Sequence, residues 1–134
     1  LKIKNMYFNG TSHKDQRGVL FYNNIVDLKE VKRLYIIENK NMSINRGWKG
    51  HRIEKRWFLC VRGKMKIQVV KLRSTANEIL NNTINTYILD DKSLNYVIVE
   101  PGYATKITQL ENDSRVLVLA DSYVGEFNDD IFIN

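Results

Sequence analysis

Short apolar runs separated by glycine are the feature that most restricts what this chain can fold into. Val, Ile, Tyr, Phe and Leu dominate the runs, and several alternate apolar with polar residues, as half-buried β-strands do. No window of a dozen residues carries the 3.6-residue apolar stripe of an amphipathic helix. The sequence predicts strands over Lys2–Phe8, Val19–Asn23, Val31–Ile37, Arg56–Val61, Lys64–Leu72, Ile84–Leu89, Tyr96–Glu100, Thr105–Leu110 and Arg115–Ala120.

The connections between these strands carry turn residues. All seven glycines fall between the runs or at their ends, where glycine can supply the positive φ of a tight turn. Arg62-Gly63 and Pro101-Gly102 are the sharpest signals, whereas Ser74–Asn82 fits either one helical turn or a long hairpin loop. Many evenly spaced strands predict an all-β sandwich or barrel, and because no linker or repeat divides the chain, we expect one domain over residues 1–134.

The net charge of +6 raises the question of a nucleic-acid partner. The basic residues are scattered, and in Lys64–Val69 they alternate with apolar residues, as on a strand with one solvated face. Because nucleic-acid-binding proteins gather such charge on one helix or sheet face, we expect no nucleic-acid partner. The basic cluster around Arg46 remains suited to a smaller anion such as a diphosphate.

The sequence also bears on the compartment in which the protein works. No apolar run approaches the roughly 20 residues needed to cross a bilayer, and the first residues lack a continuous apolar signal core. Cys60 is the only cysteine and lies in the apolar run Trp57–Val61, which predicts a buried, unreactive thiol. We therefore expect a cytoplasmic protein with no membrane partner.

Two histidines are the residues best suited to proton transfer near neutral pH. His13 lies in a polar segment and is expected to be a solvated loop residue. His51 follows a Gly-rich turn and precedes a predicted strand, where it could make a structural hydrogen bond or exchange protons with a substrate. No second histidine stands near His51, so a transition-metal site is not expected, and the common hydrolase and nucleotide-binding motifs are absent.

Six short blocks follow one another in a characteristic order: Asp15–Leu20, Lys32–Ile37, Arg46–His51, Trp57–Gly63, Val99–Tyr103 and Arg115–Tyr123. Together they resemble the small cupins that act on dTDP-4-keto-6-deoxysugars. These are the 3,4-ketoisomerases and, more distantly, the dTDP-4-dehydrorhamnose 3,5-epimerases. The resemblance spans roughly residues 15 to 128.

The resemblance implies a cupin-type jelly-roll barrel and a homodimer with strands exchanged or paired across its interface. It implies an isomerase or epimerase without metal or other cofactor, acting on a dTDP-linked keto-sugar in the biosynthesis of unusual surface-polysaccharide sugars. After Arg-Gly, the family pattern is x-His-x-His in the ketoisomerases and x-His-x-Gln in the epimerases. Here Lys49 falls on the first histidine and His51 keeps the second, while Thr105 stands where ketoisomerases often carry histidine.

The resemblance also implies roles for individual residues. His51 is the expected base, and Lys49, two residues earlier on the same strand face, would lie beside the developing oxyanion. Tyr35 or Tyr123 would act as the acid. Arg33 and Arg46 are expected to bind the diphosphate. The other expected substrate-binding residues are Trp48, Arg56, Tyr103 and Thr105.

Two other functions stay open. Lys49 and Thr105 fit a non-catalytic sugar-nucleotide-binding cupin with a degenerate active site. A ligand-sensing cupin would usually carry a fused DNA-binding helical module, for which the sequence shows no pattern. Deuterium uptake from heavy water would separate an enolising enzyme from both.

Overall fold

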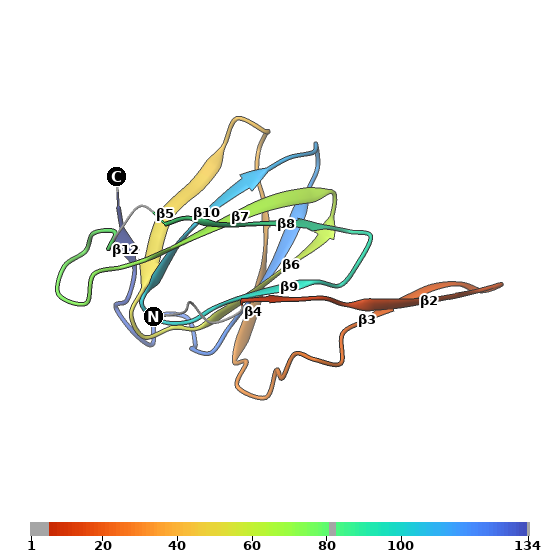
Figure 1. The fold of residues 1–134 in the computed structure, drawn as a ribbon, viewed down its shortest axis with the longest axis horizontal. Helices are drawn as coiled ribbons and strands as arrows, with labels where there is room; N and C mark the ends of the chain where they lie inside the picture. Colours follow the sequence, from red (N-terminus) through yellow and green to blue (C-terminus); the bar gives the residue numbers. More distant parts are fainter. Residues whose placement is uncertain (1–5, 81–82, 134) are drawn as a thin grey trace.

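The structure is a computed structural model that describes residues 6–80 and 83–133, and these residues form strands and loops without a helix. Two five-stranded antiparallel sheets face each other, with strand orders β1-β9-β6-β11-β4 and β12-β5-β10-β7-β8, and a separate hairpin, β2–β3, extends away from them (Figure 1). The strands are β1 (Tyr7–Phe8), β2 (Thr11–Asp15), β3 (Gly18–Tyr22), β4 (Arg33–Glu38), β5 (Asn45–His51), β6 (Arg56–Arg62), β7 (Lys64–Lys71), β8 (Asn85–Asp90), β9 (Tyr96–Val99), β10 (Tyr103–Gln109), β11 (Arg115–Ala120) and β12 (Ile131–Phe132). The expected all-β, cupin-type jelly roll is confirmed.

The inner faces of the two sheets enclose the main core. Successive side chains of a strand point to opposite faces, so every second residue of β7 and of β11 reaches this core. Met65, Ile67 and Val69 of β7 are fully buried there, as are Val116 and Val118 of β11. The period-two pattern of the sequence is therefore the cause of the two-sheet arrangement.

A smaller apolar cluster lies on the outer face of the second sheet. It joins Val70 of β7 and Ala104 of β10 to Ile131 of the C-terminal strand β12, with Trp48 of β5 packed against them. Burial of Ile131 anchors the tail of the chain against β5, where Ile131 pairs with Gly50. This anchor positions the acidic residues that precede β12.

The predicted strands mostly correspond to observed ones, with three exceptions. The prediction over Lys2–Phe8 is represented by β1 alone, because residues 1–5 lie outside the described residues. Strands β2, β5 and β12 were not expected, so the loop assigned to His13 is wrong, although its side chain is solvated. Residues 74–80 form a loop rather than a helical turn, and residues 81–82 lie outside the described part.

The glycines divide into two kinds. Gly63 and Gly102 have φ values of 76° and 93° and form the predicted turns before β7 and β10. Gly47 and Gly50 instead lie inside β5, so the predicted turn there is wrong. A Cβ on Gly47 would come within 2.6 Å of Lys106 Cα, so these glycines serve close packing between strands.

The single cysteine behaves as the sequence predicts. Cys60 is buried and unpaired in β6, and burial raises the pKa of its thiol to about 11. Such a thiol carries almost no thiolate at neutral pH and is unreactive. Separately, no helix capable of crossing a membrane occurs in the part of the chain that the structure describes.

Candidate active site

Strand β5 brings the predicted acid–base residues to one cavity. Lys49 and His51 point to the same inner face because they are two residues apart. Pairing with β10 places Thr105 opposite Lys49 and Tyr103 opposite His51. A cavity of about 470 Å³ opens at this end of the sandwich, and its lining includes Arg33, Tyr35, Lys49, His51, Glu54 and Arg56.

Two further hollows meet this cavity. The larger, of about 600 Å³, is lined by Arg46, Thr105 and Phe132 among others and shares Tyr35, Lys49 and Arg56 with the first. The smaller lies between His51, Glu54, Tyr103 and Thr105 and again includes Lys49 and Arg56. Lys49 and Arg56 therefore line all three spaces. The sequence predictions Arg33, Tyr35, Arg46, Lys49, His51, Arg56, Tyr103, Thr105 and Tyr123 all line at least one of these spaces.

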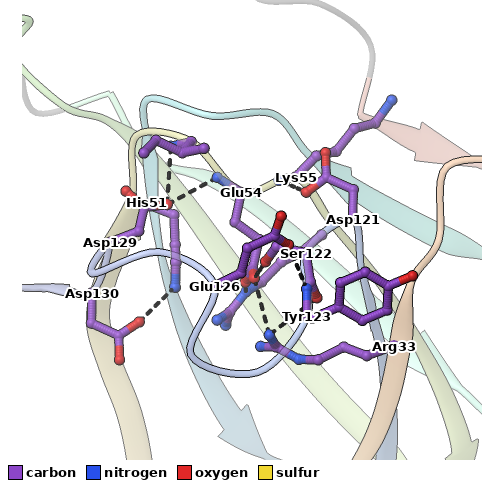
Figure 2. A network of polar contacts seen from close by, with 12 residues as sticks. Arg33, His51, Glu54, Lys55, Asp121, Ser122, Tyr123, Glu126, Asp129 and Asp130 are labelled. Atoms are coloured by element: carbon purple, nitrogen blue, oxygen red, sulfur yellow. Dashed lines mark hydrogen bonds and ion pairs between the residues drawn. The ribbon is translucent and has the colours of Figure 1, made fainter.

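One carboxylate joins the two central residues. Asp130 Oδ1 lies 3.3 Å from His51 Nε2 (Figure 2). Asp130 Oδ2 lies 3.3 Å from Lys49 Nζ. A carboxylate can only accept hydrogen bonds, so a neutral His51 ring donates from Nε2. Nδ1 is then the nitrogen with the free lone pair.

The neighbouring Asp129 fixes the loop that follows β5. Its two oxygens accept hydrogen bonds from the backbone N–H groups of Arg52, Ile53 and Glu54, at 2.9 to 3.0 Å. Burial alone would raise the pKa of Asp129, but these three hydrogen bonds lower it below its ordinary value. The charged carboxylate therefore ties the C-terminal segment to the loop beneath the cavity.

A third carboxylate, that of Glu54, lies in the lining of the cavity. Glu54 is almost fully buried and accepts from Arg56 Nε at 2.6 Å, Arg33 Nη1 at 3.2 Å and the Ser122 hydroxyl (Figure 2). Burial acts to raise the pKa of Glu54, but the hydrogen bonds from Ser122 and Arg56 outweigh it and lower the pKa. The guanidinium groups of Arg33 and Arg56 also lie over the Tyr35 ring, at 5.4 Å and 6.0 Å from its centroid.

The cavity favours neutral His51 and neutral Tyr35. Burial, reinforced by the positive charge of Arg56, lowers the pKa of His51 to about 4. Burial also raises the pKa of Tyr35 above its ordinary value, although Arg56 and Arg33 partly oppose this. At neutral pH the cavity thus offers an unprotonated imidazole and a protonated phenol, one able to accept a proton and the other able to donate one.

Three of the predicted site residues lie in surroundings that the sequence did not indicate. Trp48 points away from the cavities and packs in the outer apolar cluster with Ile131, because residues on either side of Lys49 face the opposite way. Tyr123 is 60% exposed at the rim of the first cavity, with Lys32 Nζ 5.4 Å from its ring centroid. Arg46 lines only the second cavity and donates from Nε to Asn39.

Sequence reasoning missed Glu54, Ser122, Asp129 and Asp130. Asp129 and Asp130 lie in the C-terminal segment Phe127–Ile133, for which the sequence analysis gave no site residue. Two adjacent acids in an otherwise apolar segment are a signal that could have marked them. Glu54 had no such signal, since it lies within the charged segment Arg52–Arg56, whose composition is typical of a solvated loop.

Within residues 6–80 and 83–133, no three His, Cys, Asp or Glu side chains gather in a way that could hold a metal ion.

Comparison with known proteins identifies the family. A family model described as "FdtA: WxcM-like, C-terminal" matches residues 3–132. No curated protein matches the sequence. Among solved structures, the chain is similar to the rmlC epimerase of Mycobacterium tuberculosis, with a TM-score of 0.76 and 20% identity over 95% of this chain and 67% of that one.

Two ketoisomerase structures are similar to the same extent. A variant of QdtA, a 3,4-ketoisomerase from Thermoanaerobacterium thermosaccharolyticum in complex with TDP-4-keto-6-deoxyglucose, gives a TM-score of 0.71 at 22% identity, covering 93% of this chain and 84% of that one. A 3,4-ketoisomerase from Helicobacter canadensis gives 0.70 at 20% identity, covering 93% and 87%. These identities show a shared fold. The family model spans nearly the whole sequence, and this chain therefore belongs to the FdtA, WxcM-like C-terminal family.

Proposed function

We propose that the protein is a sugar-nucleotide isomerase or epimerase that removes the proton beside the keto group of a dTDP-4-keto-6-deoxyhexose. The observation that carries the proposal is the pairing of a neutral, buried His51 with the cation of Lys49 at one cavity, through the carboxylate of Asp130. Family membership and the fold shared with 3,4-ketoisomerases and epimerases support the substrate class.

The first step is proton abstraction by His51. Nδ1 of the neutral ring takes the proton from the carbon next to the keto group, and the electrons of that C–H bond form the C=C bond of an enolate. Asp130 accepts from Nε2 and so favours both the required tautomer and the imidazolium that forms. A positioned base of this kind contributes about 100- to 10,000-fold in rate.

The enolate oxygen requires a nearby cation or hydrogen-bond donor. Lys49 lies where the cavities join and supplies an ammonium group beside the base. Such a group stabilises negative charge that develops in the transition state more than it stabilises the ketone. Lysine in place of the family's first histidine is therefore compatible with the reaction.

The second step returns a proton and decides the product. Delivery to the opposite face of the same carbon gives epimerisation, while delivery to the former carbonyl carbon gives ketoisomerisation. In the second case the neighbouring hydroxyl becomes the new ketone, and its proton is transferred to the former carbonyl oxygen, which becomes a hydroxyl. Tyr35, protonated and half-buried over the two arginines, is the proton donor favoured by its position, and Tyr123 at the rim is the alternative.

The diphosphate is expected in the first cavity. Arg33 and Arg56 line it together and can offer forked, charge-assisted hydrogen bonds to phosphate oxygens. Arg46 lies in the second cavity, next to Thr105. Tyr103 and Thr105 border the space beside His51 and are proposed to contact the sugar.

Incubation with dTDP-4-keto-6-deoxyglucose in heavy water tests the proposal. We expect solvent deuterium in the sugar, at C4 of a 3-keto product for a ketoisomerase and at C3 or C5 for an epimerase. His51→Asn should abolish the uptake while leaving the melting temperature nearly unchanged, and His13→Asn is the matched control on the exposed hairpin. A wild-type protein that binds the nucleotide but takes up no deuterium would establish the non-catalytic alternative.

We further propose a homodimer. The hairpin β2–β3 extends away from the two sheets (Figure 1) and exposes Val19, Leu20 and Phe21. Strand β4 is an edge strand of the first sheet whose outward residues Leu34 and Ile36 are 65% and 46% exposed. An unpaired edge beside apolar side chains favours strand addition from a second copy.

We propose a cellular location and a biosynthetic role from the chemistry of the cysteine and from the resemblance to the dTDP-sugar isomerases. A free cysteine fits a reducing compartment, and with the nucleotide-sugar substrate it supports a cytoplasmic enzyme. The resemblance to dTDP-sugar isomerases supports a role in making unusual sugars of surface polysaccharides.

A further inference from the structure

The buried carboxylate of Glu54 is unexpected in a cavity that we propose to bind an anion. The side chain is only 7% exposed, and three groups donate to it: Arg33, Arg56 and Ser122. On charge alone, a carboxylate at this place repels a diphosphate. Its presence requires another physical reason.

The geometry of the two arginines supplies that reason. Arg56 contacts Glu54 through Nε, and Arg33 contacts it through Nη1, which also donates to the Ser122 carbonyl. Within residues 6–80 and 83–133, no other acceptor is hydrogen-bonded to Arg56, so both its terminal nitrogens are available to a ligand. Glu54 thus uses one nitrogen of each arginine, and Arg56 keeps both terminal nitrogens available, while the Arg33 side chain also hydrogen-bonds to Tyr35.

The same contact holds the two cations close together. Two guanidinium groups beside one ring, that of Tyr35, repel each other unless an anion lies between them. Glu54 occupies this place, and its ionised state is favoured by the hydrogen bonds from Ser122 and Arg56. Long arginine side chains that are already fixed lose less conformational entropy when a ligand binds.

We infer that Glu54 is a positioning residue that holds Arg33 and Arg56 as a preorganised cradle for the diphosphate of the substrate. This inference rests on the proposed function for the identity of the ligand. The arrangement leaves the three side chains with one net positive charge, whereas the charge of Lys49 at the same cavity is paired with that of Asp130.

Removal of the Glu54 carboxylate has two opposite effects on the affinity of the cavity for an anion, and the net effect tests the inference. Loss of its negative charge strengthens the attraction of the cavity for an anion. Loss of the anchor frees two arginines to repel each other and to adopt other rotamers, which weakens binding. The positioning role predicts that the second effect is larger.

Calorimetric titration with thymidine diphosphate and with inorganic pyrophosphate measures the balance. Glu54→Gln should raise the Kd for both ligands about tenfold or more, and the KM of the sugar nucleotide should rise more than kcat falls. Glu78→Gln is the matched control because it makes the same substitution at a glutamate that also contacts an arginine Nε, that of Arg73, outside the three cavities. Its Kd values should stay within about twofold of wild type.

A second variant guards against loss of the fold. Glu54→Asp keeps the charge, but its side chain is one methylene shorter and cannot hold both arginines, so it too should bind more weakly. Unchanged or tighter binding by folded Glu54 variants overturns the positioning role. A wild-type protein that binds pyrophosphate but not thymidine diphosphate contradicts the proposed nucleotide substrate and leaves the cradle intact, whereas binding of neither ligand overturns both.

Discussion

Lys49 and His51 contact the two oxygens of one carboxylate, that of Asp130, at 3.3 Å each. The aspartate comes from the other end of the chain and reaches them because β12 pairs with β5 through Ile131 and Phe132. The Phe132 ring lies 5.5 Å from Lys49 Nζ, so the tail contacts the lysine by two kinds of interaction. The acid–base pair of the proposed reaction is therefore set by the C-terminal segment as much as by β5.

Asp130→Asn is expected to lower kcat by about 10- to 100-fold with little change in KM. The amide removes the charge that favours the imidazolium and no longer fixes the Nε2–H tautomer of His51. The effect is smaller than for a buried dyad because the Asp130 side chain is 53% exposed. Glu111→Gln is the control, since Glu111 is equally exposed and pairs with Lys64 away from the cavity. Equal rates for both variants would show that Asp130 does not act on the base.

The buried, neutral His51 predicts a specific dependence of stability on pH. Its folded-state pKa is about 4, lowered by burial and by Arg56, while the unfolded chain titrates near 6.5. Between these values the unfolded state binds the additional proton, so the free energy of unfolding is fully retained above pH 6.5 and falls as the pH drops toward 4. The charged groups around the ring, Glu54, Asp129, Asp130 and Lys49, do not change this sign.

Urea unfolding at pH 7.0 and pH 5.0 measures this effect. His51→Gln, which cannot titrate, should lose less stability than wild type over this interval. The carboxylates with lowered pKa values, Glu54 and Asp129, contribute their own losses at lower pH and so do not mask it. If the free energy of unfolding fell by the same amount in the variant and in the wild type, the imidazole would not be buried in its neutral form.

Arg33 and Arg46 were both expected on the diphosphate, and the structure separates them. Arg33 lines the first cavity, while Arg46 lines the second. We expect Arg33→Ala to weaken thymidine diphosphate binding by about tenfold or more, as loss of a charge-assisted contact does. Arg46→Ala should have an effect below about threefold, measured by the same titration. The reverse order would place the diphosphate in the second cavity.

The proposed dimer gives a prediction about a surface far from the chemistry. Phe21→Asp places a charge among the exposed apolar residues of β3 and should convert a dimer to a monomer in light-scattering measurements. Ile88→Lys is the matched control, because Ile88 is similarly exposed, at 45% compared with 40%, on β8, the outermost strand of the second sheet. Dissociation by the control alone would move the interface to β8.

The sequence allowed the fold and the centre of the site to be predicted because each rested on a local pattern. Alternation with period two marked β7 and a continuous apolar run marked β11, while the resemblance placed Lys49 and His51, two residues apart, on one strand face. The apolar pattern alone did not predict the strand β5 that carries them, since Gly47 and Gly50 have the composition of a turn. Only the close approach of Lys106 and Leu72 shows why glycine is required within this strand.

The remainder of the site depended on contacts between distant parts of the chain. Asp130 is 79 residues from His51, and Ser122 is 68 residues from Glu54. No periodicity or motif within a single segment specifies such a pair. The carboxylates that organise the cavity therefore became apparent only when the strands were paired.

Trp48 is the residue whose position in the structure differs most clearly from the sequence prediction. The sequence placed it with the substrate-binding residues, but its side chain packs outside the second sheet against Val70, Ala104 and Ile131. Trp48→Ala should therefore lower the free energy of unfolding by about 2 kcal/mol, less than for a fully buried tryptophan because the side chain is half-buried. Its KM for the sugar nucleotide should equal that of wild type. Thr105→Val on the inner face of neighbouring β10 should have the opposite pattern, with a raised KM and nearly unchanged stability in urea unfolding followed by circular dichroism. If Trp48→Ala raised KM several-fold without loss of stability, the tryptophan would contact the substrate as the sequence had suggested.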